Sequence, residues 1–226
     1  MEPKIEDLDA ALKLMAPIIS HEIRNPMAVI GNSSYFIKTK LSRSGDTDPK
    51  VTKHLGIIES EIKHANDVLG EMLAYARMRD PAPQPQDLNT LVGAALDNLP
   101  VPEHVTLKKS LSKSVPKVLA DNTLVPQALR HVIRNAVEAL LAPDPGIVRI
   151  KTGGDGKFGV VEVSDTGPGI PEKVRDRLFT PFTTEKPRGT GLGLAFAAKV
   201  MRLHKGRVET VPIDKGTCFK IFLPAA

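Results

Sequence analysis

The chain has little of what secreted and membrane-spanning proteins need. Cys218 is the single cysteine among 226 residues, so no internal disulfide can form, which fits a reducing compartment. No apolar run approaches the ~18 residues that cross a bilayer, so we expect no direct membrane insertion. The N-terminus lacks the apolar segment of a signal peptide. Together these absences predict a cytoplasmic location.

Aromatic residues are also scarce, at 4% of the chain, and there is no tryptophan. The formal net charge of +5 suits an anionic ligand, but the lysines and arginines are spread along the whole sequence. A nucleic-acid surface commonly combines a basic patch with aromatic side chains, and the sequence has no such patch. We therefore expect no nucleic-acid binding. A nucleotide or an acidic protein partner fits the charge equally well.

Two long helical patterns are present instead, over residues 5–43 and 51–79. In both, apolar residues recur at spacings of three and four, which is typical of a coiled-coil seam. Turn-forming residues between Ser42 and Pro49 join the two patterns into a predicted helical hairpin. The seam residues are Ile5, Leu8, Leu12, Met15 and Ile19 in the first pattern, and Leu55, Ile58, Ile62, Ala65, Leu69, Met72 and Ala76 in the second.

A single hairpin cannot bury both apolar stripes well. Two paired hairpins would bury them in a four-helix bundle, so the long and narrow seam predicts a homodimer. The alternative is a hairpin that packs on the rest of its own chain.

Prolines alternate through the segment 81–87 and end the second helical pattern. They favour an extended linker between a hairpin domain, residues 1–80, and a second domain, residues 88–226. In the second domain, helices mixed with antiparallel strands predict a two-layer α/β sandwich, so the fold class is α+β. The expected helices cover 88–99, 172–178 and 191–204, and a further helix that Asp121 or Asn122 caps is expected to run to about Leu141. The expected strands cover 105–111, 147–151, 160–163, 207–211 and 217–223.

His21 lies within the first helical pattern but off its seam, so its imidazole is expected to face solvent. A neutral imidazole is a competent nucleophile, and the carboxylate of Glu22 could accept the proton of its second nitrogen. Pro26 is expected to kink the helix nearby. Taken alone, a His–Glu pair on an exposed helix face is more often a plain solvated surface.

Two segments of the second domain suggest nucleotide chemistry. Asn135 sits beside the apolar side of a predicted helix, and its carboxamide oxygen suits Mg²⁺, although a hydrogen-bonded core asparagine is an equal alternative. Asp165 follows a predicted strand and can accept a hydrogen bond from an exocyclic amine, while Gly167 and Gly169 let the backbone approach a flat ligand. The alternative there is a plain Gly-Pro turn.

Two further segments follow. Residues 178–188 are polar and rich in proline and resemble a mobile lid with aromatic hinges such as Phe182. In this lid Lys186 and Arg188 could neutralise phosphates or be ordinary loop charges. The next segment lies at the start of a predicted helix and comprises Gly189, Thr190, Gly191, Leu192, Gly193 and Leu194. Its backbone N–H groups are suited to bind an anion. The alternative is that the segment is only a flexible joint. It lacks the preceding strand of a Rossmann turn and the Gly-Lys-Ser/Thr of a Walker loop.

Together these segments resemble the sensor histidine kinases of two-component signalling, from about residue 8 to residue 224. Each motif is weak alone, but five in order are specific. Ser20–Pro26 resembles the H box, Asn135-Ala136 the N box, Asp165–Gly169 the first glycine box, Phe179–Phe182 the F box, and Gly189–Leu194 the second glycine box.

The resemblance implies a dimerisation and histidine-phosphotransfer hairpin followed by a Bergerat-type ATPase domain. His21 would accept the γ-phosphoryl group of ATP with Glu22 as acid/base, and Asn25 matches a motif linked to phosphatase activity. Asn135 would hold Mg²⁺, Asp165 would contact adenine, and the glycines would line the lid and the phosphates. The implied partner is the receiver domain of a response regulator, whose aspartate takes the phosphoryl group.

The sequence also departs from the family pattern. Many relatives carry a further asparagine where this chain has His131, and the usual acidic residue near the N box is represented only by Glu138. Only nineteen residues precede Ser20, so we expect the sensor domain to be missing or borne by another protein. Two other functions stay open: a nucleotide-gated clamp or chaperone-like ATPase, and a scaffold that binds nucleotide without phosphotransfer.

Overall fold

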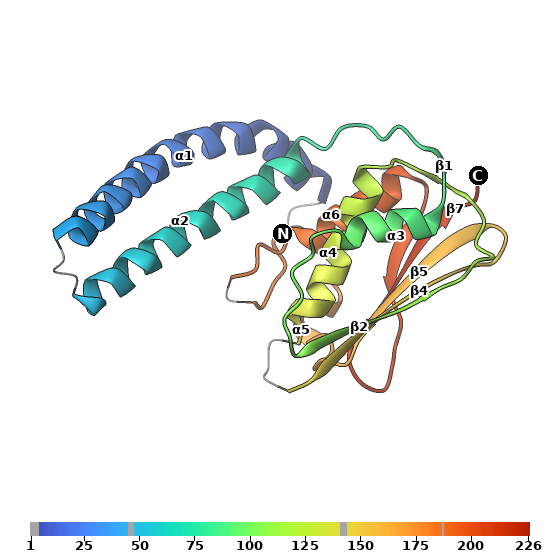
Figure 1. The fold of residues 1–226 in the computed structure, drawn as a ribbon. Coiled ribbons are helices and arrows are strands. Elements are labelled where there is room, and N and C mark those ends of the chain that lie inside the picture. The colour runs from blue at the N-terminus through green and yellow to red at the C-terminus, as the bar shows by residue number, and fades with distance from the viewer. Residues whose placement is uncertain (1–4, 45–47, 141–143, 187) are drawn as a thin grey trace. The chain divides into compact units, whose positions relative to one another are not determined.

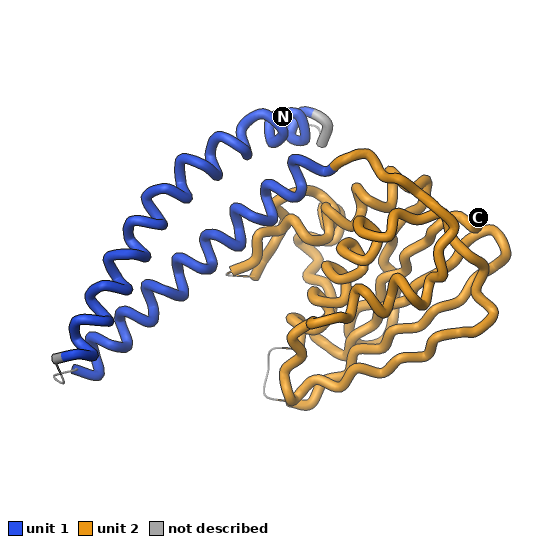
Figure 2. The backbone as a smooth tube through the Cα atoms, turned by 45° about the horizontal axis from the view of Figure 1, so that its top comes forward, with its two compact units in different colours: residues 1–78 blue, residues 79–226 orange. Residues whose placement is uncertain are grey.

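The computed structural model describes residues 5–44, 48–140, 144–186 and 188–226. The chain divides into two compact units, residues 1–78 and residues 79–226, coloured separately in Figure 2.

Unit 1 is a helical hairpin of α1 (Ile5–Ser44) and α2 (Pro49–Ala76), as predicted (Figure 1). α2 begins at Asp48, whose side chain accepts a hydrogen bond from the Lys50 amide, with proline in the first turn. α1 continues through Pro17 and Pro26 as one curved helix (Figure 1). The predicted turn residues Gly45 and Asp46 lie outside the described residues.

The seam between α1 and α2 is only partly the predicted one. Leu12, Leu55 and Leu69 are buried, whereas Met15 is 55% exposed and Ile58 is 39% exposed. Met15 and Ile58 therefore belong to an outward apolar face, whereas Ala16, which the predicted seam did not include, is fully buried. The side chain of Ile5 lies outside the described residues. None of the described helices has a stretch long and apolar enough to cross a membrane.

Unit 2 is a five-stranded sheet with α3, α4 and α6 packed against one face (Figure 1), which confirms the two-layer sandwich. The strand order is β2-β4-β5-β7-β6. The elements are α3 (Leu88–Leu96), β2 (Val105–Leu111), α4 (Leu124–Glu138), β4 (Gly146–Gly154), β5 (Phe158–Asp165), α5 (Glu172–Arg175), α6 (Gly193–Leu203), β6 (Arg207–Thr210) and β7 (Cys218–Pro224).

The sheet is mixed, so the expectation of antiparallel strands was wrong for one pair. β2 and β4 run parallel, while the other pairs in this sheet are antiparallel. The physical reason is the connection between β2 and β4, which includes α4 and is long enough for a crossover. Along β4 and β5 buried and more exposed residues alternate, as one covered face requires.

The segment predicted as a linker, 81–87, is partly a strand of unit 2. β1 (Gln84–Gln86) pairs antiparallel with β3 (Val118–Ala120), and the sequence reasoning missed both strands. Pro85 sits opposite Leu119 in this two-stranded sheet, where an edge strand tolerates a residue without an N–H group. The prolines therefore extend the backbone as expected, but the extended segment is bound to unit 2.

Asp121 fastens the start of that segment. Its carboxylate receives two bonds from Arg79, at 2.7 and 3.0 Å, and one from the Ala82 amide at 2.9 Å. It also accepts bonds from the amides of Thr123 and Leu124 at the start of α4. Burial by itself would raise the pKa of Asp121, but the bonds from Arg79 and three backbone amides outweigh burial and hold the pKa well below its usual range.

Replacing Asp121 by alanine is expected to lower the free energy of unfolding of unit 2 by about 3 kcal/mol, because it leaves buried amides without an acceptor. The measurement is urea unfolding of the full chain. Because the pKa of Asp121 is depressed in the fold, its stabilisation is present at neutral pH and disappears as the pH falls below the ordinary aspartate range. The control is Asp155→Ala, an exposed carboxylate that also accepts two amide bonds and should cost far less. Equal losses for the two variants would contradict this account.

Candidate functional site

His21 lies on the outside of α1, with 73% of its side chain exposed. This confirms the prediction that the imidazole faces solvent. Its Nδ1 atom is 3.1 Å from Oε1 of Glu22. A carboxylate only accepts hydrogen bonds, so Nδ1 is the donor and the lone pair of a neutral ring lies on Nε2. Asn25, one turn further along the helix, is also exposed.

In unit 2, Asn135 of α4 is bound to the lid. Its Oδ1 atom accepts a hydrogen bond of 2.8 Å from Nζ of Lys186, and the same Nζ is 2.8 Å from Oε2 of Glu138. Glu138 is also 3.5 Å from Nε of Arg134. The predicted Mg²⁺ ligand therefore presents its oxygen to a cation in this structure. Glu138, whose role the sequence did not settle, pairs with that cation.

Asp165 ends β5 and is 2% exposed. Its Oδ1 atom accepts hydrogen bonds from the amides of Gly167, at 2.8 Å, and Thr217, at 3.2 Å. Burial raises the pKa of Asp165 above its ordinary value, and the bonds from Gly167 and Thr217 oppose the shift. The carboxylate is thus fixed in direction by two backbone groups.

Two residues beside Asp165 were not predicted as part of the site. Thr217 supplies one of the amides, and Gly216 allows β7 to approach, since a Cβ atom at Gly216 would lie 1.9 Å from the Asp165 carbonyl oxygen. Gly216 also has a positive φ of 90°. The signal in the sequence was the run Lys215-Gly216-Thr217, directly at the start of the strand predicted over 217–223.

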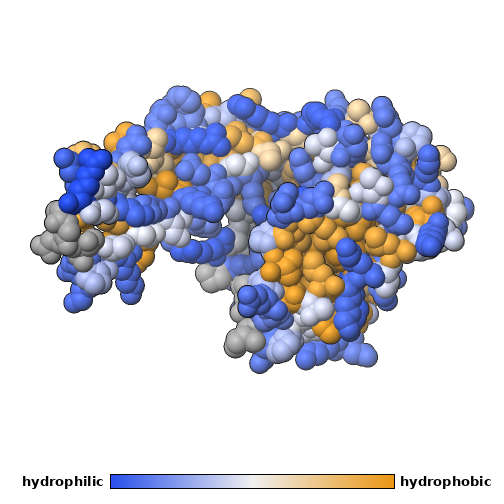
Figure 3. All heavy atoms as spheres, viewed as in Figure 1, coloured by the Kyte–Doolittle hydropathy of each residue, from blue (hydrophilic) through white to orange (hydrophobic). Residues whose placement is uncertain are grey.

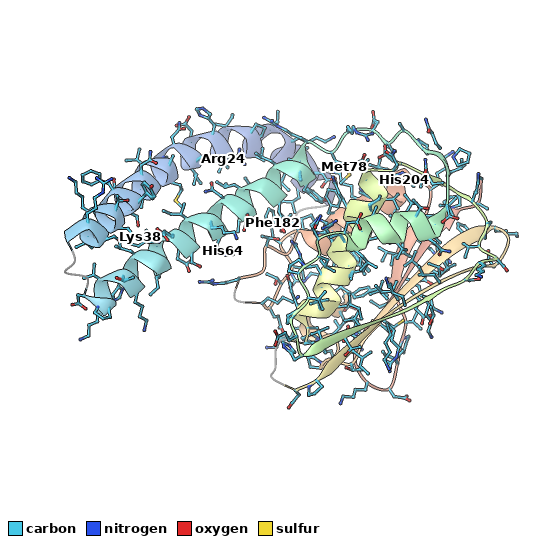
Figure 4. The ribbon with its side chains drawn as sticks, viewed as in Figure 1. Arg24, Lys38, His64, Met78, Phe182 and His204 are labelled. Atoms are coloured by element: carbon cyan, nitrogen blue, oxygen red, sulfur yellow. The ribbon has the colours of Figure 1, made fainter. Side chains whose placement is uncertain are left out.

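The lid and the second glycine segment contact each other. Phe182 has a φ of 65°, and its amide donates to the Gly191 carbonyl oxygen at 3.0 Å. A Cβ atom at Gly191 would lie 2.5 Å from the Phe182 carbonyl carbon, so this approach requires glycine. Phe182, marked in Figure 4, is 47% exposed. The other aromatic residue of the lid, Phe179, packs its ring edge-on against the ring of Phe219.

The second glycine segment leads directly into α6. Leu192 caps the helix without a side-chain hydrogen bond, and its own amide donates to Oγ1 of Thr190 at 3.2 Å. A Cβ atom at Gly189 would lie 2.5 Å from Oγ1 of Thr184, which keeps this turn tight. Leu192 therefore offers no side-chain cap to the N–H groups in the first turn of α6.

The four predicted segments meet along α4. Gly193, at the start of α6, faces His131; Lys186 of the lid binds Asn135 and Glu138. Gly167 packs at the carboxyl end of α4, where a Cβ atom on this glycine would be 3.2 Å from the Ala139 carbonyl oxygen. Gly169, with a φ of 87°, continues the same loop toward Gly216. Segments far apart in sequence therefore line one helix, as in a ligand site.

Comparison with known proteins agrees with this geometry. Residues 11–81 match the model of the His Kinase A (phospho-acceptor) domain. Residues 120–226 match the model of the histidine kinase-, DNA gyrase B-, and HSP90-like ATPase. The chain belongs to the sensor histidine kinases.

Among the relatives, the sensory histidine kinase/phosphatase NtrB of Rhodobacter capsulatus is 29% identical, over 94% of the chain and 62% of NtrB. Sporulation kinase A of Bacillus subtilis is 33% identical, over 98% of the chain and 36% of that protein. The solved structure of the histidine kinase ThkA in complex with the response regulator TrrA is 26% identical, with a TM-score of 0.69, over 99% of the chain and 64% of ThkA. The chain thus spans less than two thirds of each.

The fold is also that of ShkA, solved in complex with AMPPNP, at a TM-score of 0.72 and 24% identity over 94% of the chain and 46% of ShkA. Within the described ranges of the chain, no group of three or more histidine, cysteine or acidic side chains is arranged to hold a metal ion.

Proposed function

We propose that this chain is a histidine kinase core that transfers the γ-phosphoryl group of ATP to His21 and then to an aspartate of a response regulator. The observation that supports this most strongly is that three of the nucleotide segments line α4, which carries the fourth, in a chain that also exposes the His21–Glu22 pair. The proposed domains are residues 1–80 for phosphotransfer and 88–226 for ATP binding. Only part of the segment 81–87 serves as a linker between these domains, because residues 84–86 form β1, a strand of unit 2.

The nucleotide is placed by residues of unit 2. The buried carboxylate of Asp165 accepts from the adenine amine, and Gly167 and Gly169 let the ring approach the backbone. The N-terminal amides of α6 face the phosphates, together with the segment that contains Gly189, Thr190, Gly191, Leu192 and Gly193. Phe182 and Lys186 belong to the lid over them.

Mg²⁺, when bound, would neutralise charge on the phosphates. The Oδ1 atom of Asn135 is a suitable ligand, because it is an oxygen that already accepts a bond from a cation, Lys186. On this proposal Asn135 would hold the ion through Oδ1, and Lys186 would then pair with phosphate oxygens or stay on Glu138.

The chemical step uses the geometry at His21. The lone pair on Nε2 forms a bond to the γ-phosphorus, and the bond from that phosphorus to the β–γ bridging oxygen breaks, so ADP leaves. Glu22, bonded to Nδ1, accepts the ring proton as the charge develops. In the second step the regulator's carboxylate attacks the phosphorus and Nε2 leaves. Asn25, exposed one turn away, would orient water for dephosphorylation of the regulator, and NtrB carries the name kinase/phosphatase.

The proposed partners follow from the same surfaces. A response regulator receiver domain is supported by the ThkA–TrrA complex. Sensing is assigned to a domain outside this chain or on another protein, since the relatives are longer. A cytoplasmic location is supported by the free, buried Cys218 and by the need for ATP.

A homodimer is proposed from the outward face of the hairpin. Twelve large apolar side chains on α1 and α2 are exposed within one chain, and Figure 3 shows such side chains as orange spheres on the hairpin. A second copy would cover them in a four-helix bundle. They are Leu14, Met15, Ile18, Ile23, Val29, Ile30, Tyr35, Phe36, Ile37, Val51, Ile57 and Ile58.

The substitution Ile18→Glu is expected to weaken dimerisation by about 100-fold or more, because it places an unpaired charge in the bundle. Analytical ultracentrifugation over a concentration series measures the dissociation constant. Lys63→Glu serves as the control, since its neighbours one turn away along α2 are all polar. A chain that is monomeric before substitution would contradict the homodimer.

The proposed activity is tested with γ-labelled ATP and Mg²⁺. We expect label on the protein that is lost in acid and kept in base, and peptide mapping that places it on His21. ATP turnover without labelled protein would favour the clamp or chaperone-like ATPase. Nucleotide binding with neither label nor turnover would favour a scaffold.

A further inference from the structure

We infer that His131 is a positioning residue of the nucleotide site, which sets the place of the phosphate-binding end of α6 by filling the space left by the absent side chain of Gly193. The inference rests on the proposed nucleotide site, but not on phosphotransfer to His21.

The first observation is a close fit between the imidazole and the start of α6. A Cβ atom at Gly193 would lie 3.1 Å from Nδ1 of His131 and 3.5 Å from its Cγ. The ring also contacts Phe196, one turn into α6, with ring centroids 5.0 Å apart. The imidazole is therefore packed against the first turn of α6 at two points, and a Cβ atom at 193 would require the ring to give way by a few tenths of an ångström.

The second observation is that His131 belongs to the polar network of the site. Nη2 of Arg134 lies 3.3 Å from Nδ1 of His131. A guanidinium group only donates, so Nδ1 accepts and the ring proton of the neutral form lies on Nε2. Arg134 pairs with Glu138, which in turn pairs with Lys186 of the lid. The orientation of the imidazole is thus tied to the groups around Asn135.

These two contacts have one consequence for the ligand. The amides of the first turn of α6 bind phosphate only if they point at it, and a shift of a few tenths of an ångström changes that fit. Asp165, which would hold the adenine, is bonded to Gly167 and Thr217 and not to this pair. A change at His131 or Gly193 should therefore weaken contacts to phosphate and leave contacts to adenine intact.

The experiment is a double-mutant cycle on the full chain with His131→Asn, Gly193→Ala and both together. Dissociation constants are measured by calorimetry for two probes, a non-hydrolysable ATP analogue with Mg²⁺ and adenosine alone. Gly193→Ala should weaken the analogue by about tenfold, because its Cβ atom displaces the imidazole. In the His131→Asn background the smaller side chain makes room, so the same substitution should cost about twofold or less. Adenosine affinity should stay unchanged in all three variants.

The control is Gly93→Ala in α3, where a Cβ atom would meet nothing within 4 Å. It should leave both affinities unchanged. Additive losses in the cycle, or an equal loss of adenosine affinity, would overturn the inference. If Gly193→Ala alone does not fold, the double variant is compared directly with His131→Asn, and a further tenfold loss there overturns it as well. If the unsubstituted chain binds the analogue but is never labelled, the proposed kinase activity fails while this inference is still tested.

Discussion

Replacing His21 by glutamine is expected to remove the acid-labile phosphoryl label completely, a loss of about 10³-fold or more in the rate of labelling. Glutamine is polar and fits an exposed helix position, and 73% of the His21 side chain is exposed, so the hairpin should keep its stability. Every group proposed to bind the nucleotide lies in unit 2, so affinity for an ATP analogue should not change. Label incorporation and calorimetry on the same preparation measure the two quantities.

Two matched controls lie on the other helix of the hairpin. His54→Gln and His64→Gln change the same residue type on α2, where Figure 4 marks His64, and both should keep the label. Glu22→Gln should slow labelling by about 10²-fold, because Nδ1 loses its proton acceptor, without a change in nucleotide affinity. Label that persists in His21→Gln would show that another side chain is the acceptor.

Local patterns were sufficient to predict most of the fold. The hairpin followed from the spacing of apolar residues, and the strands predicted over 147–151 and 160–163 lie within β4 and β5. Ends of elements were less accurate: the helix predicted to run to about Leu141 is α4, Leu124–Glu138, although Asp121, one of its two predicted caps, does accept bonds from the amides of Thr123 and Leu124. Helix ends depend on such individual hydrogen bonds, and the spacing of apolar residues in the sequence gives no information about them.

The pairing of β1 with β3 could not be predicted, because both strands are three residues long and one contains proline. What holds the segment in place is a set of bonds between Arg79, Ala82 and Asp121, about forty residues apart in sequence. The backbone amide of Asp121 also donates to Nε2 of the buried His204, marked in Figure 4. Contacts at such separation leave no periodic signal in the chain.

The same limit applies to the candidate site. Residue type and motif order indicated Asn135, Asp165 and the glycines, because each has a chemistry that a nucleotide needs. The partners that orient them were not visible: Thr217 is 52 residues from Asp165, and Lys186 is 51 residues from Asn135. His131 appeared only as a departure from the family pattern, and its fit against Gly193 emerges once α4 and α6 are packed together.

Replacing Asp165 by asparagine is expected to weaken nucleotide binding by about 100-fold, for ATP and adenosine alike. Asparagine keeps the size of the side chain, but it turns one acceptor into a donor in a position that is 2% exposed and faces the Gly167 and Thr217 amides. The NH₂ group of the asparagine would then face another hydrogen-bond donor, either one of those two backbone amides or the adenine amine. Calorimetry with both ligands measures the loss.

The pH dependence of binding gives a second, independent measurement of the same carboxylate. Burial raises the pKa of Asp165, so on acidification it takes up a proton at a higher pH than an exposed aspartate does. Adenosine affinity should therefore fall as the pH drops toward this raised pKa, because the protonated group loses an acceptor, and it should level off above it. Asp165→Asn cannot titrate there and should show weak binding without this slope, whereas Asp155→Asn, at an exposed turn, should retain both the affinity and the slope. If Asp165→Asn binds adenosine as tightly as the unsubstituted chain, adenine is recognised by some other group.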